Sequence, residues 1–265
     1  MSLLHLYDLP SWLFGTVVVG TFVAFALIGQ IVFRRFLPRW FGPDKHYNEI
    51  VGQFLSASGV FFGITLGLLS VGAWENFGAV DDAVTQEATE IGVMYRIVDN
   101  FPDPHRTILT DSLRAYTRHE IDVAWPKQQK GITPGSGGNA ILDQFHRYLT
   151  HNIEPVTEAQ KAQYAEALRQ FSHMIGARRA RLAAVSTRLP PIVWFVVFGG
   201  SVLNLSLMWL LVVENKRLHD ILTVMLAALL GLLVFLLAIM DFPFRGDYSV
   251  GPDSFELIHD QLMQK

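Results

Sequence analysis

The sequence predicts an all-α, polytopic membrane protein with four transmembrane helices and a soluble helical bundle inserted between the second and the third helix. Three observations support this fold class. Apolar residues make up 51% of the chain and charged residues only 17%, whereas about a quarter of the residues are charged in ordinary soluble domains. Four stretches are long and apolar enough to cross a bilayer. Of the 45 charged residues, 27 lie between Glu75 and Arg188.

The first predicted span covers residues 12–33 and ends at Arg34 and Arg35. No Lys or Arg precedes this span, whereas a cleavable signal peptide needs a basic start, a shorter apolar core and a small-residue cleavage site. We therefore expect a retained transmembrane anchor. A connector is expected at residues 34–49, because Pro38 and Pro43 oppose one long helix.

The second predicted span, residues 50–74, contains 25 residues without a charge. At ~1.5 Å per residue this is enough to cross a hydrocarbon core of about 30 Å. Small residues recur along it at steps of three and four, which places them on one helical face: Gly52, Ser56, Gly59, Gly63, Gly67 and Ser70. Small residues let neighbouring backbones approach closely in lipid, so we predict that this stripe makes a helix–helix or subunit contact.

Bulkier residues lie on the opposite face of the second span: Phe54, Phe61, Thr65 and Leu68. Such a row can form a hydrophobic constriction that gates a pore by dewetting. The same row can also be a surface that faces lipid. Both interpretations remain open at the level of the sequence, and these four residues are the pore-lining candidates.

Residues 75–189 are expected to form the soluble helical bundle. Thr157 followed by Gln160 has the spacing of a capping box, which predicts the start of a long helix. No run of alternating apolar and polar residues suggests a strand. The expected elements are a continuation of the second helix to residue 101, helices at residues 104–125 and 140–151, a Gly- and Pro-rich loop at residues 126–138, and a long helix from residue 157 to residue 189.

The third and fourth spans are predicted at residues 189–213 and 221–240. Asn204 in the third span has two interpretations, a polar group on a permeation path or an interhelical hydrogen bond that fixes packing. Four spans place both termini and the bundle on one side of the membrane. The predicted organisation is transmembrane helices 1 and 2 with a basic connector (1–74), the bundle (75–189), transmembrane helices 3 and 4 (190–241) and a C-terminal segment (242–265).

The sequence contains no set of residues for catalysis, and we predict that the protein is not an enzyme. His119-Glu120 is not followed by a second His at the spacing of zinc proteases, and no nucleophile elbow or phosphate-binding loop occurs. The chain has no cysteine, so thiolate chemistry is absent. We expect no cofactor. The net charge of −3 gives no reason to expect nucleic acid as a partner.

Three arginines, Arg178, Arg179 and Arg181, lie on the expected long helix before the third span. One interpretation is a cluster that attracts anions or contacts lipid headgroups. The other is ion pairing with Glu87 and Glu90 on a facing helix, or simple solvation. The sequence leaves these interpretations open.

The segment after the last span allows a comparison with a known family. Asp241-Phe-Pro-Phe-Arg-Gly-Asp247 is followed by Asp253-Ser-Phe-Glu256, and this pattern resembles the segment after the last span of bestrophin anion channels. The order of two spans, a soluble helical domain and two spans is also similar. The chain is thus identified as a member of the bacterial bestrophin-like family, with a resemblance that covers nearly its full length.

The resemblance implies a homo-oligomer, pentameric in bestrophins, whose second span lines a central pore. In bestrophins the acidic segment helps to bind calcium, and the corresponding weak calcium candidates here are Asp247, Asp253 and Glu256. Calcium usually takes six to eight oxygen ligands. Three carboxylates without a compact loop are too few, so no metal site is predicted.

We therefore expect an oligomeric ion channel in the lipid bilayer, permeable to an inorganic anion such as chloride, in a bacterial plasma (inner) membrane. The alternative is a non-conducting membrane scaffold or sensor whose soluble bundle binds a partner. The side of the membrane that the bundle faces stays open. The charge rule places the bundle outside, because the basic residues cluster in the two connectors, whereas the resemblance places it inside.

Overall fold

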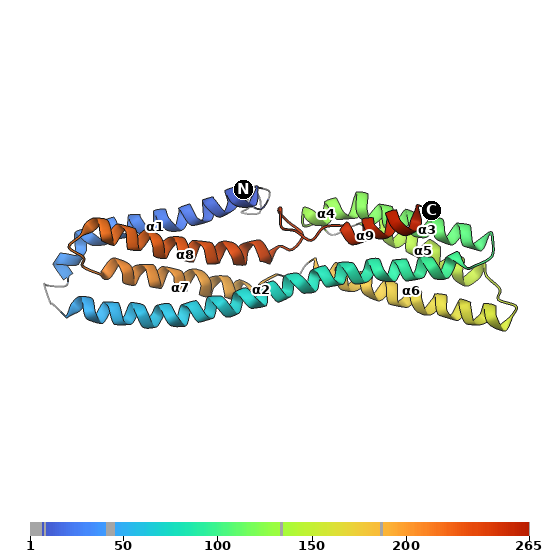
Figure 1. Ribbon diagram of the computed structural model, residues 1–265, viewed down its shortest axis with the longest axis horizontal. Helices are drawn as coiled ribbons and strands as arrows, with labels where there is room; N and C mark the ends of the chain where they lie inside the picture. Colours follow the sequence, from blue (N-terminus) through green and yellow to red (C-terminus); the bar gives the residue numbers. More distant parts are fainter. Residues whose placement is uncertain (1–6, 8, 41–45, 133–134, 186–187, 265) are drawn as a thin grey trace. The chain divides into compact units, whose positions relative to one another are not determined.

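The computed structural model describes residues 7, 9–40, 46–132, 135–185 and 188–264, with the backbone alone for residues 37–40. No strand occurs among these residues, which confirms the predicted all-α class. The helices shown in Figure 1 are α1 (Ser11–Trp40), α2 (Tyr47–Asp99), α3 (His105–His119), α4 (Trp125–Gln129), α5 (Gly137–His151), α6 (Glu158–Ala184), α7 (Pro191–Leu210), α8 (Lys216–Asp241) and α9 (Asp253–Ile258), with π-helical segments at Glu120–Ala124 and His259–Met263.

The chain divides into two compact units. The first, here called the membrane unit, contains Met1–Asn76, Arg188–Phe242 and Gly246–Tyr248. The second, here called the bundle unit, contains the rest, namely Phe77–Thr187, Pro243–Arg245 and Ser249–Lys265. The helix α2 contributes its first half to the membrane unit and its second half to the bundle unit.

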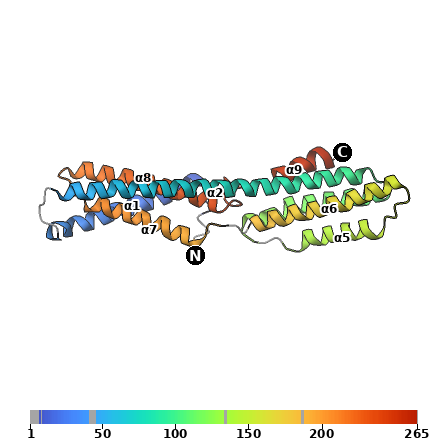
Figure 2. The same cartoon turned by 90° about the horizontal axis from the view of Figure 1, so that it is seen from below.

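The membrane unit consists of α1, α7, α8 and the first half of α2, which run side by side (Figures 1 and 2). Four helices in the described part of the chain are long and apolar enough to cross a membrane, and they are these four. The number and order of the predicted spans are therefore confirmed.

The largest buried side chain in the apolar core of the membrane unit is Trp209 of α7. Its indole nitrogen donates to the Ala26 carbonyl of α1 at 2.8 Å, and its ring lies against Gly29. A Cβ atom at Gly29 would come within 2.2 Å of Cζ2 of that ring, so only glycine permits this contact. Trp209 therefore gains a partner for its N–H while it fills the gap between two helices.

The bundle unit has its own apolar core, to which the second half of α2 and the helices α3, α5, α6 and α9 contribute. The predicted capping box at the start of α6 is present. The Thr157 hydroxyl accepts from the Gln160 backbone N–H at 3.2 Å, and the Gln160 side chain accepts from the Thr157 N–H at 3.0 Å. Two otherwise orphaned donors of the first turn are thereby satisfied.

The helix boundaries differ from the expectation at two places. α1 continues through Pro38 to Trp40, although a connector was expected from residue 34; a proline in the last turn removes one hydrogen bond but keeps a helical φ. The single helix expected at residues 104–125 is divided by the π-helical segment Glu120–Ala124, and α4 then ends at Gln129. A π-helical turn inserts one residue into a helix and shifts the direction of the side chains that follow.

Candidate functional site

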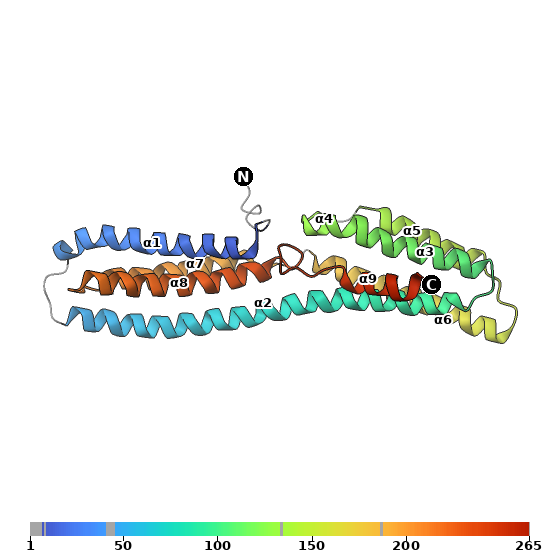
Figure 3. The ribbon, with the colours of Figure 1, turned by 45° about the horizontal axis from the view of Figure 1, so that its top comes forward.

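The first half of α2 is the element on which the predicted pore depends, and α2 is one helix from Tyr47 to Asp99 (Figure 3). Only a narrow face of this half is buried. Phe62, Leu66 and Ala73 belong to the apolar core formed with α1, α7 and α8. The Phe62 ring lies against Gly200 of α7, where a Cβ atom would come within 2.2 Å of it. This face therefore fixes α2 on the rest of the membrane unit.

Asn204 adds a polar contact to the same face. The Ser58 hydroxyl of α2 donates to Asn204 Oδ1 at 3.3 Å, and Asn204 Nδ2 donates to the Gly200 carbonyl at 2.9 Å. Asn204 is buried, with 3% of its surface exposed. The interhelical hydrogen bond, one of the two interpretations of this residue, is therefore present.

The small-residue stripe is not covered by the chain's own helices. Around Gly52, Gly63 and Gly67, no atom of another described helix lies within 4 Å of the position that a Cβ would take, and at Gly59 only Asn204 Oδ1 comes as near as 4.0 Å. The two serines satisfy their hydroxyls within α2, because Ser56 donates to the Gly52 carbonyl and Ser70 to that of Leu66. The stripe is thus free to contact lipid or a second copy of the chain.

The pore-lining candidates lie about a quarter turn from the buried face, on the side opposite the stripe. Phe54, Phe61 and Leu68 are 67%, 74% and 70% exposed. Thr65 donates its hydroxyl hydrogen to the Phe61 carbonyl at 2.9 Å, which leaves only the acceptor side of its oxygen for its surroundings. Phe54, Phe61 and Thr65 border an open groove of about 790 Å³ between α2 and α7. Three members of the row therefore form a largely exposed apolar surface, and the fourth, Thr65, is half-buried.

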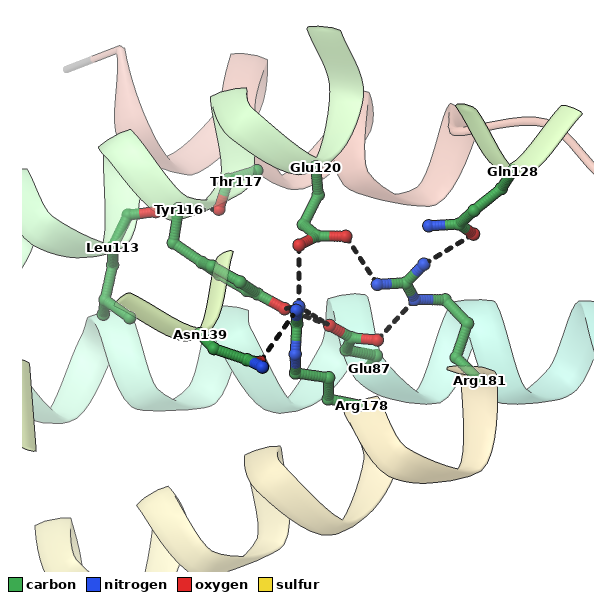
Figure 4. Close-up of polar contacts among 9 residues, drawn as sticks. All are labelled: Glu87, Leu113, Tyr116, Thr117, Glu120, Gln128, Asn139, Arg178 and Arg181. Atoms are coloured by element: carbon green, nitrogen blue, oxygen red, sulfur yellow. Dashed lines mark hydrogen bonds and ion pairs between the residues drawn. The ribbon is translucent and has the colours of Figure 1, made fainter. Parts of the chain in front are cut away.

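A different site lies inside the bundle unit, where four buried charges meet (Figure 4). Arg181 donates from Nε to Glu87 Oε2 and from NH2 to Glu120 Oε2, both at 2.6 Å. Arg178 donates from NH1 to Glu120 Oε1 at 2.6 Å, and the same nitrogen lies 3.9 Å from Glu87 Oε1. We call Glu87, Glu120, Arg178 and Arg181 the charge cluster. The two negative charges of its carboxylates balance the two positive charges of its guanidinium groups.

Neutral side chains complete the charge cluster. The Tyr116 hydroxyl donates to Glu87 Oε1 at 2.5 Å and accepts from Arg178, while Gln128 Oε1 accepts from Arg181 NH1 at 2.8 Å. Burial raises the pKa of the Tyr116 hydroxyl well above its ordinary value, and the carboxylates of Glu87 and Glu120 raise it further. Tyr116 therefore stays protonated and acts as a fixed donor.

Burial opposes the charged form of Arg181, but attraction to Glu87 and Glu120 outweighs it, so the pKa of Arg181 lies above its usual value. The guanidinium also lies over the rings of Trp125 and Phe255, at 5.6 and 5.5 Å from their centroids. The charge cluster thus joins α2, α6 and α9 with the segment around Glu120. Such a buried arrangement without net charge suits a structural role, because each charged group is paired with a group of opposite charge within the cluster.

The first turn of α5 closes over the charge cluster. A Cβ atom at Gly138 would come within 2.6 Å of Glu120 Oε1 and 2.8 Å of Arg178 NH2. Asn139 Oδ1 accepts from Arg178 NH2 at 3.3 Å. Glycine at residue 138 is therefore what lets the helix approach these charged groups.

Of the three arginines proposed to attract anions, only Arg179 is exposed. Arg178 and Arg181 are buried and pair with Glu87, as the second interpretation holds, and with Glu120, which that interpretation did not name. Glu90 accepts instead from the Gln170 amide at 2.5 Å.

A signal for the charge cluster exists in the sequence. Glu87 occupies a seam position of α2 and Glu120 a seam position after α3, since each continues a series of buried residues at steps of three and four. The series are Val80, Val84, Glu87, Ile91 and Met94, and Leu109, Leu113, Tyr116 and Glu120. A carboxylate at such a buried position requires a buried partner. This requirement indicates that Arg178 and Arg181 are partners of Glu87 and Glu120.

The three weak calcium candidates lie in different surroundings. Asp247 belongs to the membrane unit, and its Oδ2 accepts from the Ser11 backbone N–H at 2.8 Å at the start of α1. Asp253 and Glu256 are exposed in the first turn of α9, in the bundle unit. Within the part of the chain that the structure describes, no group of three acidic, His or Cys residues could hold a metal ion. Asp247 acts as a cap for α1, since a carboxylate is favourable at a helix start.

Comparison with known proteins agrees with this arrangement of helices. The family model described as a bestrophin-like domain matches residues 20–255. The chain belongs to the bestrophin-like family. No curated protein sequence matches it. This bestrophin-like protein is therefore a multi-pass membrane protein. Its membership of the family supports a function as an ion channel.

Solved structures of bacterial bestrophins share the fold. One variant of a bestrophin homologue from Klebsiella pneumoniae has a TM-score of 0.68 and 13% sequence identity, covering 94% of this chain and 97% of that one. A second variant of the Klebsiella homologue has a TM-score of 0.67 at 12% identity, covering 95% and 99%. A variant of a solved membrane protein has a TM-score of 0.67 and 13% sequence identity, covering 93% of this chain and 97% of that one. At such low identity the likeness establishes the fold of the bestrophin-like protein.

Proposed function

We propose that this bestrophin-like protein forms a homo-oligomeric, anion-permeable channel in the bacterial inner membrane, with the pore lined by α2. The resemblance to bestrophins suggests five copies in the ring. Chloride is the permeant ion that the proposal takes as its test case. Membership of a channel family supports conduction, and the surface of α2 supports the choice of pore helix.

The observation that carries the proposal is the exposure of α2 on both sides of its narrow buried face. No other described helix packs on the stripe at Gly52, Gly63 or Gly67, and the row of Phe54, Phe61 and Leu68 is largely exposed. Close helix contacts in lipid use small residues, and an apolar ring can close a pore by dewetting. One helix therefore offers both a contact for a neighbouring copy and a surface for a pore.

Charge along α2 bears on the selectivity. No Asp or Glu lies between Glu49 and Glu75, so the span itself provides no ring of carboxylates of the kind that selects cations. Glu49 and Glu75 themselves lie exposed at its two ends and oppose an anion there. The exposed Arg179 of the bundle unit favours an anion. Because these charges oppose one another, selectivity is tested by comparing the flux of chloride with the flux of potassium.

We expect that Phe61→Ala increases chloride flux severalfold over wild type in proteoliposomes. Removing the ring of this exposed phenylalanine widens the apolar constriction and lowers the cost of wetting it. Flux is measured after the oligomer mass has been verified in detergent, so that the same number of channels is compared.

The control is Ile28→Ala on α1, which also shortens an exposed apolar side chain, 62% exposed in this case, and should leave flux unchanged. If Phe61→Ala instead lowers the oligomer mass, Phe61 lies at the contact between copies and the proposed pore face is wrong. If neither wild type nor Phe61→Ala conducts while both remain oligomeric, the scaffold or sensor function replaces the channel.

A further inference from the structure

An apolar groove of about 480 Å³ lies on the membrane unit between α1, α7 and α8. Its walls include Phe14, Val17 and Phe22 of α1 and Phe198 of α7. Its lining residues lie where α1 and α7 begin and α8 ends. Figures 1 and 2 show that these helix ends meet at one end of the membrane unit. All three helices are long and apolar enough to cross a membrane, so an apolar groove on their outer surface is accessible to lipid.

The length of the groove corresponds to one leaflet. From Phe14 to Phe22, α1 advances by about 12 Å, and half of a hydrocarbon core of about 30 Å is close to this value. Tyr7 and Trp194 lie in the wall of the groove, and such amphipathic rings favour the membrane–water interface. The groove therefore begins near the interface and runs inward by about the depth of one acyl chain.

A cation lies at the interfacial end of the groove. The Arg188 guanidinium is 4.6 Å from the centroid of the Phe242 ring, and Phe242 forms part of the groove wall. Arg188 is exposed, and it makes no ion pair with any residue that the structure describes. Its charge is therefore available to a negatively charged group in the headgroup layer.

The carboxylates near the groove are already engaged. Asp241 is 5% exposed, and its two oxygens accept from the Leu189 backbone N–H at 2.6 Å and from Trp194 Nε1 at 3.1 Å. Asp247 accepts from the Ser11 N–H. Neither Asp241 nor Asp247 pairs with Arg188. A phosphate therefore does not compete with either carboxylate for the Arg188 guanidinium.

We propose that this groove binds an anionic phospholipid, with one acyl chain along α1 and the phosphate on Arg188. Nothing in the channel function requires this site. The apolar walls give affinity for the chain, and the single cation gives a preference for negative headgroups, because one surface Lys or Arg changes the binding of an anionic lipid about fivefold.

The test measures lipid binding to the purified oligomer by native mass spectrometry in a neutral detergent, with phosphatidylglycerol and phosphatidylcholine of the same acyl chains. Wild type should bind phosphatidylglycerol in preference to phosphatidylcholine. Arg188→Gln should lower this preference about fivefold, because one cation is lost. Val17→Trp, which fills the groove from a side chain that is 39% exposed, should lower the binding of both lipids.

Matched controls separate the site from general effects. Arg96→Gln removes an exposed arginine of the bundle unit, and Ile28→Trp enlarges an exposed side chain of α1 outside the groove; both should bind lipid like wild type. Thr21→Trp serves as a second groove-filling variant if Val17→Trp does not fold. Equal binding of the two lipids by wild type, an unchanged preference in Arg188→Gln, or full binding by a folded groove-filling variant would each overturn the proposal.

Discussion

Replacing Arg181 with alanine should destabilise the bundle unit by about 3–5 kcal/mol, the cost of leaving a buried charge without its partner. Arg181 is fully buried and donates to both carboxylates of the charge cluster. Without it, Glu87 and Glu120 share the single guanidinium of Arg178. The loss should appear as a fall on the order of 10 °C in the unfolding midpoint followed by circular dichroism.

Arg179→Ala is the matched control, because Arg179 lies two residues away on α6 and is exposed. Exposed substitutions of this kind usually change stability by no more than about 0.5 kcal/mol. Combining Arg181→Gln with Glu87→Gln should destabilise less than the sum of the two single changes, since the pair removes one charge of each sign. Equal midpoints for Arg181→Ala and Arg179→Ala would show that the charge cluster does not hold the bundle together.

Gly63→Leu should convert the oligomer to smaller species. A side chain at residue 63 meets no atom of another described helix, because none lies within 4 Å of the position of a Cβ. A leucine is therefore compatible with a folded protomer but separates any backbone that approaches the stripe. Light scattering after size-exclusion chromatography in detergent gives the mass of the assembly.

Ala57→Leu on another face of α2 provides the comparison, since Ala57 borders the groove between α2 and α7 and is exposed. Its oligomer mass should stay closer to that of wild type. The same mass for both variants, whether reduced or intact, would contradict a contact through the stripe.

The fold could be predicted because its signals are local. The 25 uncharged residues before Glu75 indicate a span, and the spacing of Thr157 and Gln160 indicates the helix start that α6 shows. The end of α1 differs from the expectation, because Pro38, whose fixed φ is compatible with a helix, lies in the last turn of α1 and does not end the helix.

The charge cluster could not be predicted in full, because it depends on contacts between distant parts of the chain. Arg181 and Glu120 are 61 residues apart, and the π-helical segment that begins at Glu120 has no signal in the sequence. The faces of α2 present the same difficulty for contacts between copies of the chain. The row of Phe61 and the stripe of Gly63 can be read from the periodicity, but which of them faces a pore depends on copies of the chain around them.

The most direct measurement of the central claim uses single cysteines, since the natural chain contains none. Phe61→Cys and, as control, Ile28→Cys on α1 are reconstituted, and chloride and potassium fluxes are recorded before and after an anionic, water-soluble thiol reagent, which an anion-permeable pore admits. A thiolate forms in water and not in lipid, so a pore-facing thiol is modified and a lipid-facing thiol is spared. The account predicts that chloride flux exceeds potassium flux and that the reagent blocks Phe61→Cys alone. Intact oligomers without flux, or flux through Phe61→Cys that the reagent leaves unchanged, would contradict a pore lined by this face of α2.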